Sequence, residues 1–428
     1  MNRREWILKS GLVAGSALLL TNCISCMQGE TGGRGKHILL VSGWQTVNIG
    51  DIAHTPGLIH LLKTYIPGVK ITLWPNDIDL VEEKMLISYF PDLTIVKDGF
   101  ADTGIAGSED ASKCISDADL LLHGSGPGIV GIQKLLLWKQ MTSKPYGVFG
   151  VTVGSLNEEL REVLNGAAFI FTRETLSLDV LSEGGVTLPQ LGFAPDATFF
   201  LPIRNDASAK FFMESRKLED RKFICVVPRL RYTPYHRVHT RINWSKEQID
   251  HVIAENLKYV EEDHQKIREV IVRYVRETGN KVVLCPEMEY QTELFEPYLY
   301  NLLPIDVQDR VVMHPYWQPD DAASLYARAA VVVSIECHSP IIALVNGTPA
   351  IYVRQPSDTI KGNMYYDLKL DDWIFEIEQC SGQQIADRVM EIFGDFDQAI
   401  EKVRLLNQRV GGIYDGNMEV VKKYLELV

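Results

Sequence analysis

Short apolar runs alternate with helical stretches along most of the chain. In the first half, five runs have the length and composition of buried strands: residues 36–43, 70–74, 119–123, 146–153 and 169–173. The segments between them carry apolar residues three and four positions apart, as in a helix with one buried face: residues 54–65, 81–89, 129–141, 158–164 and 174–184. This alternation predicts a parallel β-sheet that helices cover on both faces.

A polar stretch at residues 203–221 interrupts the alternation, which then starts again. The second set of predicted strands is residues 223–227, 281–284, 310–313, 331–335 and 350–353. The helices predicted around them are residues 244–277, with a break, and residues 292–302, 320–329 and 340–346. The chain is therefore expected to form a second parallel α/β sheet.

A chain of 428 residues is too long for one ordinary core. We expect two α/β domains, residues 36–205 and 218–390, followed by C-terminal helices at residues 391–428. Two such domains in tandem normally bind their ligand in the cleft where the carboxyl ends of the strands face each other. In such pairs the C-terminal helix often returns to brace the first domain.

The N-terminus has the pattern of an export signal. Arg3 and Arg4 precede an uncharged run at residues 10–20 that is too short to span a bilayer. The paired arginines resemble a twin-arginine signal, and the residues up to Cys23 resemble a lipoprotein cleavage box. We expect residues 1–22 to be removed, 23–35 to be a linker, and the protein to lie in the periplasm or cell envelope. A lipid anchor on Cys23 stays open, and so does the alternative of an apolar N-terminus on a cytoplasmic protein.

Charge and cysteine spacing exclude several classes of partner. The formal net charge of -13, without a basic run interleaved with aromatic residues, argues against nucleic-acid binding. Cys225 and Cys285 lie in apolar runs, where a thiol usually acts as a small buried hydrophobe. His236 and His239 have a metal-ligand spacing, but no third ligand is identifiable. We therefore expect no metal and no resident cofactor, and contact with a membrane only through a lipid on Cys23.

Two glycine-containing turns follow predicted strands. Asn48-x-Gly50-Asp51 follows the first strand, at a position where backbone N–H groups commonly face a ligand. Asp51 could instead cap the following helix, whereas Asn48 has less structural reason to be there. Gly124 and Gly126 follow the third predicted strand, and we expect residue 128 to open a helix whose N-terminus favours an anion.

Two arginines also follow predicted strands. Arg173 could meet an anion or form an ordinary ion pair with Asp196. Arg229 lies just past the first strand of the second set, and guanidinium groups match the oxygens of carboxylates and phosphates. Arg229 is therefore a candidate anion ligand, with a surface salt bridge as the alternative.

Residues 331–353 are predicted to form a strand, a turn, a helix and a strand. Glu336 to Ser339 would be the turn, and Pro340 the first helical residue. His338 would then lie near the positive end of the helix dipole, which lowers the pKa of an imidazole and suits a neutral base. A structural histidine is the alternative.

Taken in order, these segments resemble the polysaccharide pyruvyl transferase family. The similarity runs from about residue 36 to about residue 375. The matching elements are Asn48-x-Gly50-Asp51, Gly124-x-Gly126, Arg173-Glu174-x-x-Ser177, Pro195-Asp196-Ala197, the block from His338 to Pro349, and Lys361. The resemblance implies two Rossmann-like domains arranged as in GT-B glycosyltransferases. It also implies transfer of the pyruvyl unit of phosphoenolpyruvate onto two hydroxyls of a sugar, as a ketal.

The resemblance also implies roles for single residues. His338 would be the donor-site histidine and Arg229 a ligand for the anionic donor, with Lys361 and Arg354 as further anion contacts. The remaining candidates would line the cleft or the acceptor site: Asn48, Gly50, Asp51, Gly124, Gly126, Arg173 and Asp196. Phosphoenolpyruvate would be a co-substrate, and a glycan or saccharide would be the acceptor.

Two features depart from the family pattern. The family usually has an arginine where this chain has Glu336, so an anion replaces a cation that would bind phosphoenolpyruvate. At an effective dielectric near 20, a charge pair about 4 Å apart is worth roughly 4 kcal/mol, so the exchange would weaken donor binding if Glu336 points into the site. Glu336 could instead turn away and pair with Arg354. The second departure is export, because phosphoenolpyruvate is a cytoplasmic metabolite.

Three functions therefore compete. The first is pyruvyl transfer to a cell-envelope glycan. The second is an exported family member that binds a glycan without donor chemistry. The third is a different transfer to, or hydrolysis of, a sugar, with Glu336 and His338 as an acid/base pair.

Overall fold

The computed structural model describes residues 35–97, 109–124, 126–238 and 243–427. The predicted export signal, Cys23 and His239 lie outside these residues. Among the described helices, none is both long and apolar enough to cross a membrane. Residues 36–428 form one compact unit that contains two β-sheets. The division into two domains at residues 205–218 therefore remains a prediction.

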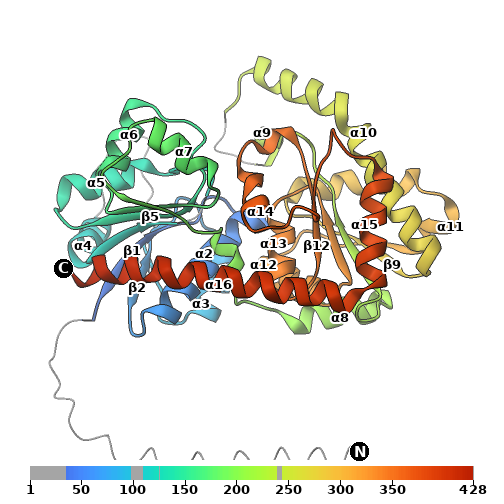
Figure 1. Cartoon of the computed structure of the whole chain (residues 1–428), viewed down its shortest axis with the longest axis horizontal. Helices are drawn as coiled ribbons and strands as arrows, with labels where there is room; N and C mark the ends of the chain where they lie inside the picture. The colour runs from blue at the N-terminus through green and yellow to red at the C-terminus, as the bar shows by residue number, and fades with distance from the viewer. Residues whose placement is uncertain (1–34, 98–108, 125, 239–242, 428) are drawn as a thin grey trace, which may run out of the picture. The chain divides into compact units, whose positions relative to one another are not determined.

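The first half of the chain forms a parallel sheet with the strand order β3-β2-β1-β4-β5-β6-β7 (Figure 1). Its strands are β1 His37–Val41, β2 Lys70–Leu73, β3 Thr94–Ile95, β4 Leu120–His123, β5 Tyr146–Val151, β6 Phe169–Thr172 and β7 Gln190–Phe193. The strand order reverses between β1 and β4, which pair directly. A reversal of this kind opens a crevice at the carboxyl ends of the two strands, where α/β proteins bind ligands.

The second half forms another parallel sheet, with the order β10-β9-β8-β11-β12-β13. Its strands are β8 Phe223–Val227, β9 Lys281–Leu284, β10 Val311–Met313, β11 Val331–Ser334, β12 Ala350–Arg354 and β13 Ile374–Glu376. Here the order reverses between β8 and β11. Every residue of β1, β8 and β11 is buried, as expected for central strands of a sheet covered on both faces.

Helices cover the faces of both sheets (Figure 1). In the first half of the chain they are α2 Ile49–Tyr65, α3 Leu80–Tyr89, α4 Glu109–Asp117, α5 Ile132–Met141, α6 Glu158–Asn165, α7 Leu176–Glu183 and η1 Ala197–Phe200, and the next helix, α8 Asp206–Arg216, packs on α12 (Pro319–Tyr326) of the second half. The later helices are α9 Tyr235–Val238, α10 Lys246–Thr278, α11 Ile305–Gln308, α12 Pro319–Tyr326, α13 His338–Val345, α14 Met364–Asp367, α15 Gly382–Gly394 and α16 Phe396–Glu426. Short helical turns complete the second half: η2 Glu289–Leu294, η3 Phe295–Leu299, η4 Tyr300–Leu302, η5 Pro356–Asp358 and η6 Lys361–Asn363.

Several helices differ from the prediction, among them α2, which begins at Ile49, five residues before the predicted start. The long helix α10 has no break, because a capping box between Ser245 and Gln248 starts it and the left-handed Gly279 ends it. Helix α5 begins at Ile132 and not at residue 128 or 129, since Gly128 and the N-cap Gly131 both have positive φ angles. Helix α13 begins at His338, two residues before Pro340.

The last helix returns to the first sheet. The ring of Tyr414 in α16 stacks on Phe149 of β5 at 6.1 Å between centroids, and Tyr424 packs on Phe169 of β6. The hydroxyl of Tyr414 lies 2.8 Å from the carbonyl oxygen of Asp196 and 3.3 Å from that of Pro195. The C-terminal helix therefore holds the segment that follows β7, as the sequence led us to expect.

The hydroxyl of Tyr414 gives a test of this brace. We expect Tyr414→Phe to lower the free energy of unfolding by about 0.5–1.5 kcal/mol, because the carbonyl oxygens of Asp196 and Pro195 lose their hydroxyl donor while Asp196 keeps the N–H of Phe199. The measurement is urea unfolding at constant pH. Leu405→Ala, in the half-exposed part of the same helix, should change stability by no more than about 0.5 kcal/mol. Equal losses in the two variants would contradict the brace.

Candidate functional site

The turn after β1 is held by Asn48 and docks on the second half of the chain. The side-chain Oδ1 of Asn48 accepts the N–H groups of Gly50 at 2.7 Å and Asp51 at 3.3 Å, so Asn48 is the N-cap of α2. The alternative in which Asp51 caps this helix is therefore wrong, and Asn48 has a structural role. The backbone N–H of Ile49 donates to the carbonyl of Glu287 at 2.9 Å.

Gly50 lies directly against His338. A Cβ atom placed on Gly50 would be 2.4 Å from the imidazole ring, far inside van der Waals contact. Only a glycine at this position lets the start of α2 approach the start of α13 so closely. The Asn48-x-Gly50 element thus places the start of α2 against His338, the predicted donor-site histidine.

His338 lies between two buried carboxylates. Its Nδ1 is 3.2 Å from Oε1 of Glu287, and its Nε2 is 3.7 Å from Oδ2 of Asp196 and 3.0 Å from Nε2 of His54. Burial lowers the pKa of His338, but interactions with Cys337, Asp196 and Glu287 outweigh it and hold the pKa well above the ordinary value. The predicted lowering by the helix dipole is therefore wrong.

Glu287 also caps the helix that carries His338. The N-cap residue Cys337 makes no side-chain capping bond, and Oε2 of Glu287 accepts the N–H of Ser339 at 2.6 Å instead. One carboxylate from the loop after β9 thus satisfies an N–H group at the start of α13 and orients the imidazole.

Asp196 joins His338 to Arg173. Its Oδ2 lies 2.7 Å from Nη1 of Arg173 and 3.2 Å from Nε2 of His54, and its Oδ1 accepts the N–H of Thr198 at 2.9 Å. Burial raises the pKa of Asp196, but His54, His338 and Arg173 outweigh it and hold the pKa well below the usual value. The predicted ion pair between Arg173 and Asp196 is confirmed, and Arg173 is fully buried beneath the site.

A second buried cluster surrounds Arg229. Its Nε is 3.2 Å from Oε1 of Glu336, and its Nη1 donates to Oδ1 of Asp358. Lys361 Nζ lies 2.8 Å from the same oxygen of Asp358, and Gln291 Nε2 donates to Oε1 of Glu336 at 2.7 Å. Arg229 and Lys361 are thus gathered as predicted, but both already face carboxylates. The surface salt bridge considered for Arg229 is wrong, because only 7% of the residue is exposed.

Glu336 points into this cluster. Burial raises the pKa of Glu336 to about 7, although the positive charge of Arg229 opposes the rise. The alternative pairing with Arg354 is wrong, because Arg354 Nη1 donates to Glu376 at 2.9 Å. Arg354 makes no ion pair with the carboxylates of this cluster, so its predicted role as an anion contact stays a prediction.

The glycines after β4 pack against the first sheet's own residues. A Cβ on Gly126 would lie 2.7 Å from Nε1 of Trp44, and one on Gly124 would lie 3.1 Å from Ser42 and Leu58. Asp51 accepts a hydrogen bond from Gln45. These contacts give each residue a packing role, and their predicted role at a cleft stays a prediction.

Four residues of the two clusters were not predicted: His54, Glu287, Gln291 and Asp358. Glu287 could have been found, since it follows the predicted strand 281–284 at its carboxyl end, where site residues gather. His54 lies inside α2, where the sequence gives no local signal for a buried imidazole.

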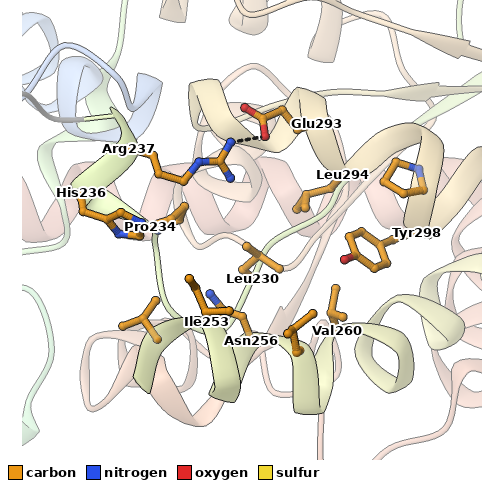
Figure 2. Close-up of a pocket in the computed structure, with 13 residues that line it drawn as sticks. Leu230, Pro234, His236, Arg237, Ile253, Asn256, Val260, Glu293, Leu294 and Tyr298 are labelled. Carbon is orange, nitrogen blue, oxygen red and sulfur yellow. Dashed lines mark hydrogen bonds and ion pairs between the residues drawn. The ribbon is translucent and has the colours of Figure 1, made fainter. Parts of the chain in front are cut away.

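A cavity of about 350 Å³ lies between α10 and the segments around residues 230–237 and 293–298 (Figure 2). Its floor includes Leu230, whose N–H donates to the hydroxyl of Tyr290 at 3.2 Å. Ile253 of α10, Leu294 and Tyr298 supply apolar walls, and an ion pair between Arg237 and Glu293 lies at one side. The cavity therefore offers mainly apolar surface, and Leu230, the residue after Arg229, is one of its lining residues.

Comparison with protein families gives one match. A model of the polysaccharide pyruvyl transferase family matches residues 48–356, which is more than half of the chain. The matched stretch begins at Asn48 and includes Asp196, Arg229, Glu336 and His338. A search of curated proteins finds no match.

Solved structures with two parallel sheets resemble the whole described fold. A glycosyltransferase from Rickettsia africae is 12% identical with a TM-score of 0.59, covering 92% of this chain and 99% of that one. Anabaena Alr3699/HepE, solved with UDP and glucose, is 12% identical with a TM-score of 0.57, covering 91% and 100%. A UDP-GlcNAc 2-epimerase from Neisseria meningitidis is 10% identical with a TM-score of 0.56, covering 90% and 100%. The predicted GT-B-like arrangement is confirmed, and at these identities the likeness concerns the fold.

The contact between Gly50 and His338 can be tested by one methyl group. We expect Gly50→Ala to displace the imidazole and to lower the free energy of unfolding by about 1–3 kcal/mol, as overpacking does in other cores. Gly154→Ala is the control, because a Cβ there meets nothing within 4 Å. Urea unfolding measures both variants. A Gly50→Ala protein as stable as the Gly154→Ala protein would contradict the contact.

Proposed function

Because this chain belongs to the polysaccharide pyruvyl transferase family, we propose that it transfers the pyruvyl unit of phosphoenolpyruvate to a sugar of a cell-envelope glycan. One observation carries the proposal within the site itself. Arg229 and Lys361, two buried or half-buried cations, lie together at the carboxyl ends of β8 and β12, next to the helix that begins at His338. Paired cations at a strand-order reversal suit a small ligand that carries both a carboxylate and a phosphate.

The reaction combines protonation of the donor, addition of one hydroxyl and displacement of phosphate by a second hydroxyl. The methylene carbon of the donor takes a proton and becomes a methyl group, which makes the neighbouring carbon electrophilic. One sugar hydroxyl adds to that carbon, and a second hydroxyl displaces the phosphate to close the ketal. Of the two protons that the hydroxyls lose, one replaces the proton given to the donor, and the other leaves with the phosphate.

The geometry supports a division of work among the residues. Arg229 and Lys361 would bind the donor's anionic groups and stabilise the departing phosphate. Glu336 touches Arg229 and is the carboxyl group best placed to give the proton to the donor. His338 would be the donor-site histidine, which Glu287 and Asp196 hold in place. The neighbouring cavity would receive apolar parts of the acceptor.

Glu336 is also the strongest argument for a second function. Phosphoenolpyruvate must compete with Glu336 and Asp358 for the two cations, and each close charge pair is worth roughly 4 kcal/mol at an effective dielectric near 20. Because Glu336 and Asp358 neutralise the two cations, the site supports a protein that binds a glycan without using the donor. We propose this binding function as the alternative to transfer.

Donor binding distinguishes the two functions. We expect Glu336→Gln to tighten phosphoenolpyruvate binding about tenfold or more, because it removes a negative charge beside Arg229. Calorimetry measures this affinity. Glu376→Gln is the matched control, since Glu376 pairs with Arg354 outside the cluster and should leave the affinity unchanged.

Turnover completes the test. Wild-type protein incubated with phosphoenolpyruvate and β-galactoside acceptors should release phosphate, and Glu336→Gln should release it at least about 100-fold more slowly if Glu336 gives the proton. No release and no donor binding in either protein would refute transfer. Glycan binding that survives in that case would support the binding function.

The location of the protein is proposed from its N-terminal sequence. We expect a mature form that lacks residues 1–22, in the periplasm or cell envelope. Cell fractionation with mass spectrometry of the purified N-terminus measures this. An uncleaved protein in the cytoplasm would contradict export and would remove one objection to phosphoenolpyruvate as donor.

A further inference from the structure

Among the described residues, the ligand atoms of His54, Asp196 and His338 form a group compact enough to share one metal ion. The two Nε2 atoms are 3.0 Å apart, and those of His54 and His338 lie 3.2 Å and 3.7 Å from Oδ2 of Asp196. In a tetrahedral zinc site with bonds of about 2.0–2.1 Å, ligand atoms are about 3.3–3.4 Å apart. We propose that these three side chains bind one divalent transition-metal ion.

The second shell of hydrogen bonds fits a metal ligand. Nδ1 of His338 faces Oε1 of Glu287 at 3.2 Å, so this nitrogen carries the proton. When an ion displaces the second ring proton, the lone pair of the neutral ring lies on Nε2, which faces His54 and Asp196. A metal-binding histidine usually donates its other ring N–H to a carboxylate in this way. The remaining oxygen of Asp196 accepts the N–H of Thr198 at 2.9 Å, which fixes that ligand too.

Charge balance around the group also calls for a cation. The guanidinium of Arg173 lies 2.7 Å from Asp196 and 3.8 Å from Glu174, and a third buried carboxylate, Glu287, lies 3.2 Å from Nδ1 of His338. A bound ion would replace the proton that these carboxylates favour on His338, and with both imidazoles then neutral Arg173 would leave two negative charges for the ion to balance. A buried charge is costly unless it is paired, and one divalent ion would balance this group.

Arg173 does not prevent metal binding. It donates to Oδ2 of Asp196, the same oxygen that faces the two histidines, and a carboxylate oxygen has two lone pairs to offer. One lone pair can accept the guanidinium while the other faces the ion. The repulsion between Arg173 and the ion is offset by the three carboxylates around them.

Two imidazoles and one carboxylate select the class of ion. This ligand set suits zinc, cobalt or iron in the divalent state, whereas calcium and magnesium prefer oxygen ligands. Three protein ligands leave a further coordination position for water or a hydroxyl group. The inference rests on the ligand geometry and not on the reaction proposed above.

The experiment uses the full-length purified protein without phosphoenolpyruvate or sugar. After treatment with a chelator, the protein is titrated with Co²⁺ while the visible spectrum is recorded, and Zn²⁺ is added in competition. We expect one ion per chain and the ligand-field bands of a four- or five-coordinate cobalt site. Thiolate charge-transfer bands should be absent, because no sulfur belongs to the ligand set.

Three variants locate the site. His54→Gln should abolish stoichiometric binding, and Glu287→Gln should weaken it about 10–100-fold through the second shell. His60→Gln is the matched control, because His60 lies on the same helix and packs on Phe200 outside the group. Circular dichroism checks that each variant folds.

Several outcomes would overturn the inference. They are the absence of stoichiometric binding by wild type, a cobalt spectrum with thiolate bands, or equal affinities of the His54→Gln and His60→Gln variants. The first two concern wild type alone, so they decide the matter even if His54→Gln does not fold. A proton shared between the two histidines would then be the cation at this place. Loss of pyruvyl transfer would leave these results unchanged, so the two proposals fail separately.

Discussion

A buried carboxylate must have both of its oxygens satisfied, and Glu287 meets this demand by joining three parts of the chain. One oxygen accepts an N–H group at the start of α13, and the other orients the ring of His338. Its backbone carbonyl accepts the first N–H of α2. The loop after β9 therefore fixes the relative positions of both helices that start at the site. The close approach of Gly50 to His338 depends on this arrangement.

The charged groups form two clusters with different consequences. Around Arg229 and Lys361 the charges cancel within the protein, because Glu336 and Asp358 match the two cations. Around Asp196 the carboxylates outnumber the guanidinium of Arg173. An incoming anion must therefore displace an internal partner from the first cluster, whereas the second cluster attracts positive charge. Family membership alone does not predict this difference between the two clusters, because the balance of charge around Arg229 depends on Glu336.

Local sequence patterns were sufficient for the central strands and for the class of fold. Strands such as Phe223–Val227 are continuous apolar runs, because both faces of the sheet are covered. Strands β3, β7 and β13 were missed, since they are two to four residues long and carry partly exposed residues. Their pairing depends on the neighbouring strand more than on their own composition.

The site was predicted less well for a physical reason. The sequence located His338 and Arg229 because both follow apolar strands, but it gave the wrong direction for the pKa of His338. The helix dipole acts locally, whereas Glu287 and Asp196 come from distant segments and outweigh it. The orientation of Glu336 could not be predicted for the same reason: Arg229 and Arg354 were both possible partners, and only the tertiary structure shows that Glu336 pairs with Arg229.

The path of α16 affects the order in which the molecule can be completed during synthesis. Both sheets end before residue 377, yet the carbonyl of Asp196 receives its hydroxyl donor from Tyr414. A ribosome releases the N-terminal part first, so the first sheet must wait for the last helix to emerge. A chain cut short by some twenty residues would keep every strand but would lack the donor behind Asp196. The hydrogen bonds behind Asp196 therefore form only after α16 has been synthesised.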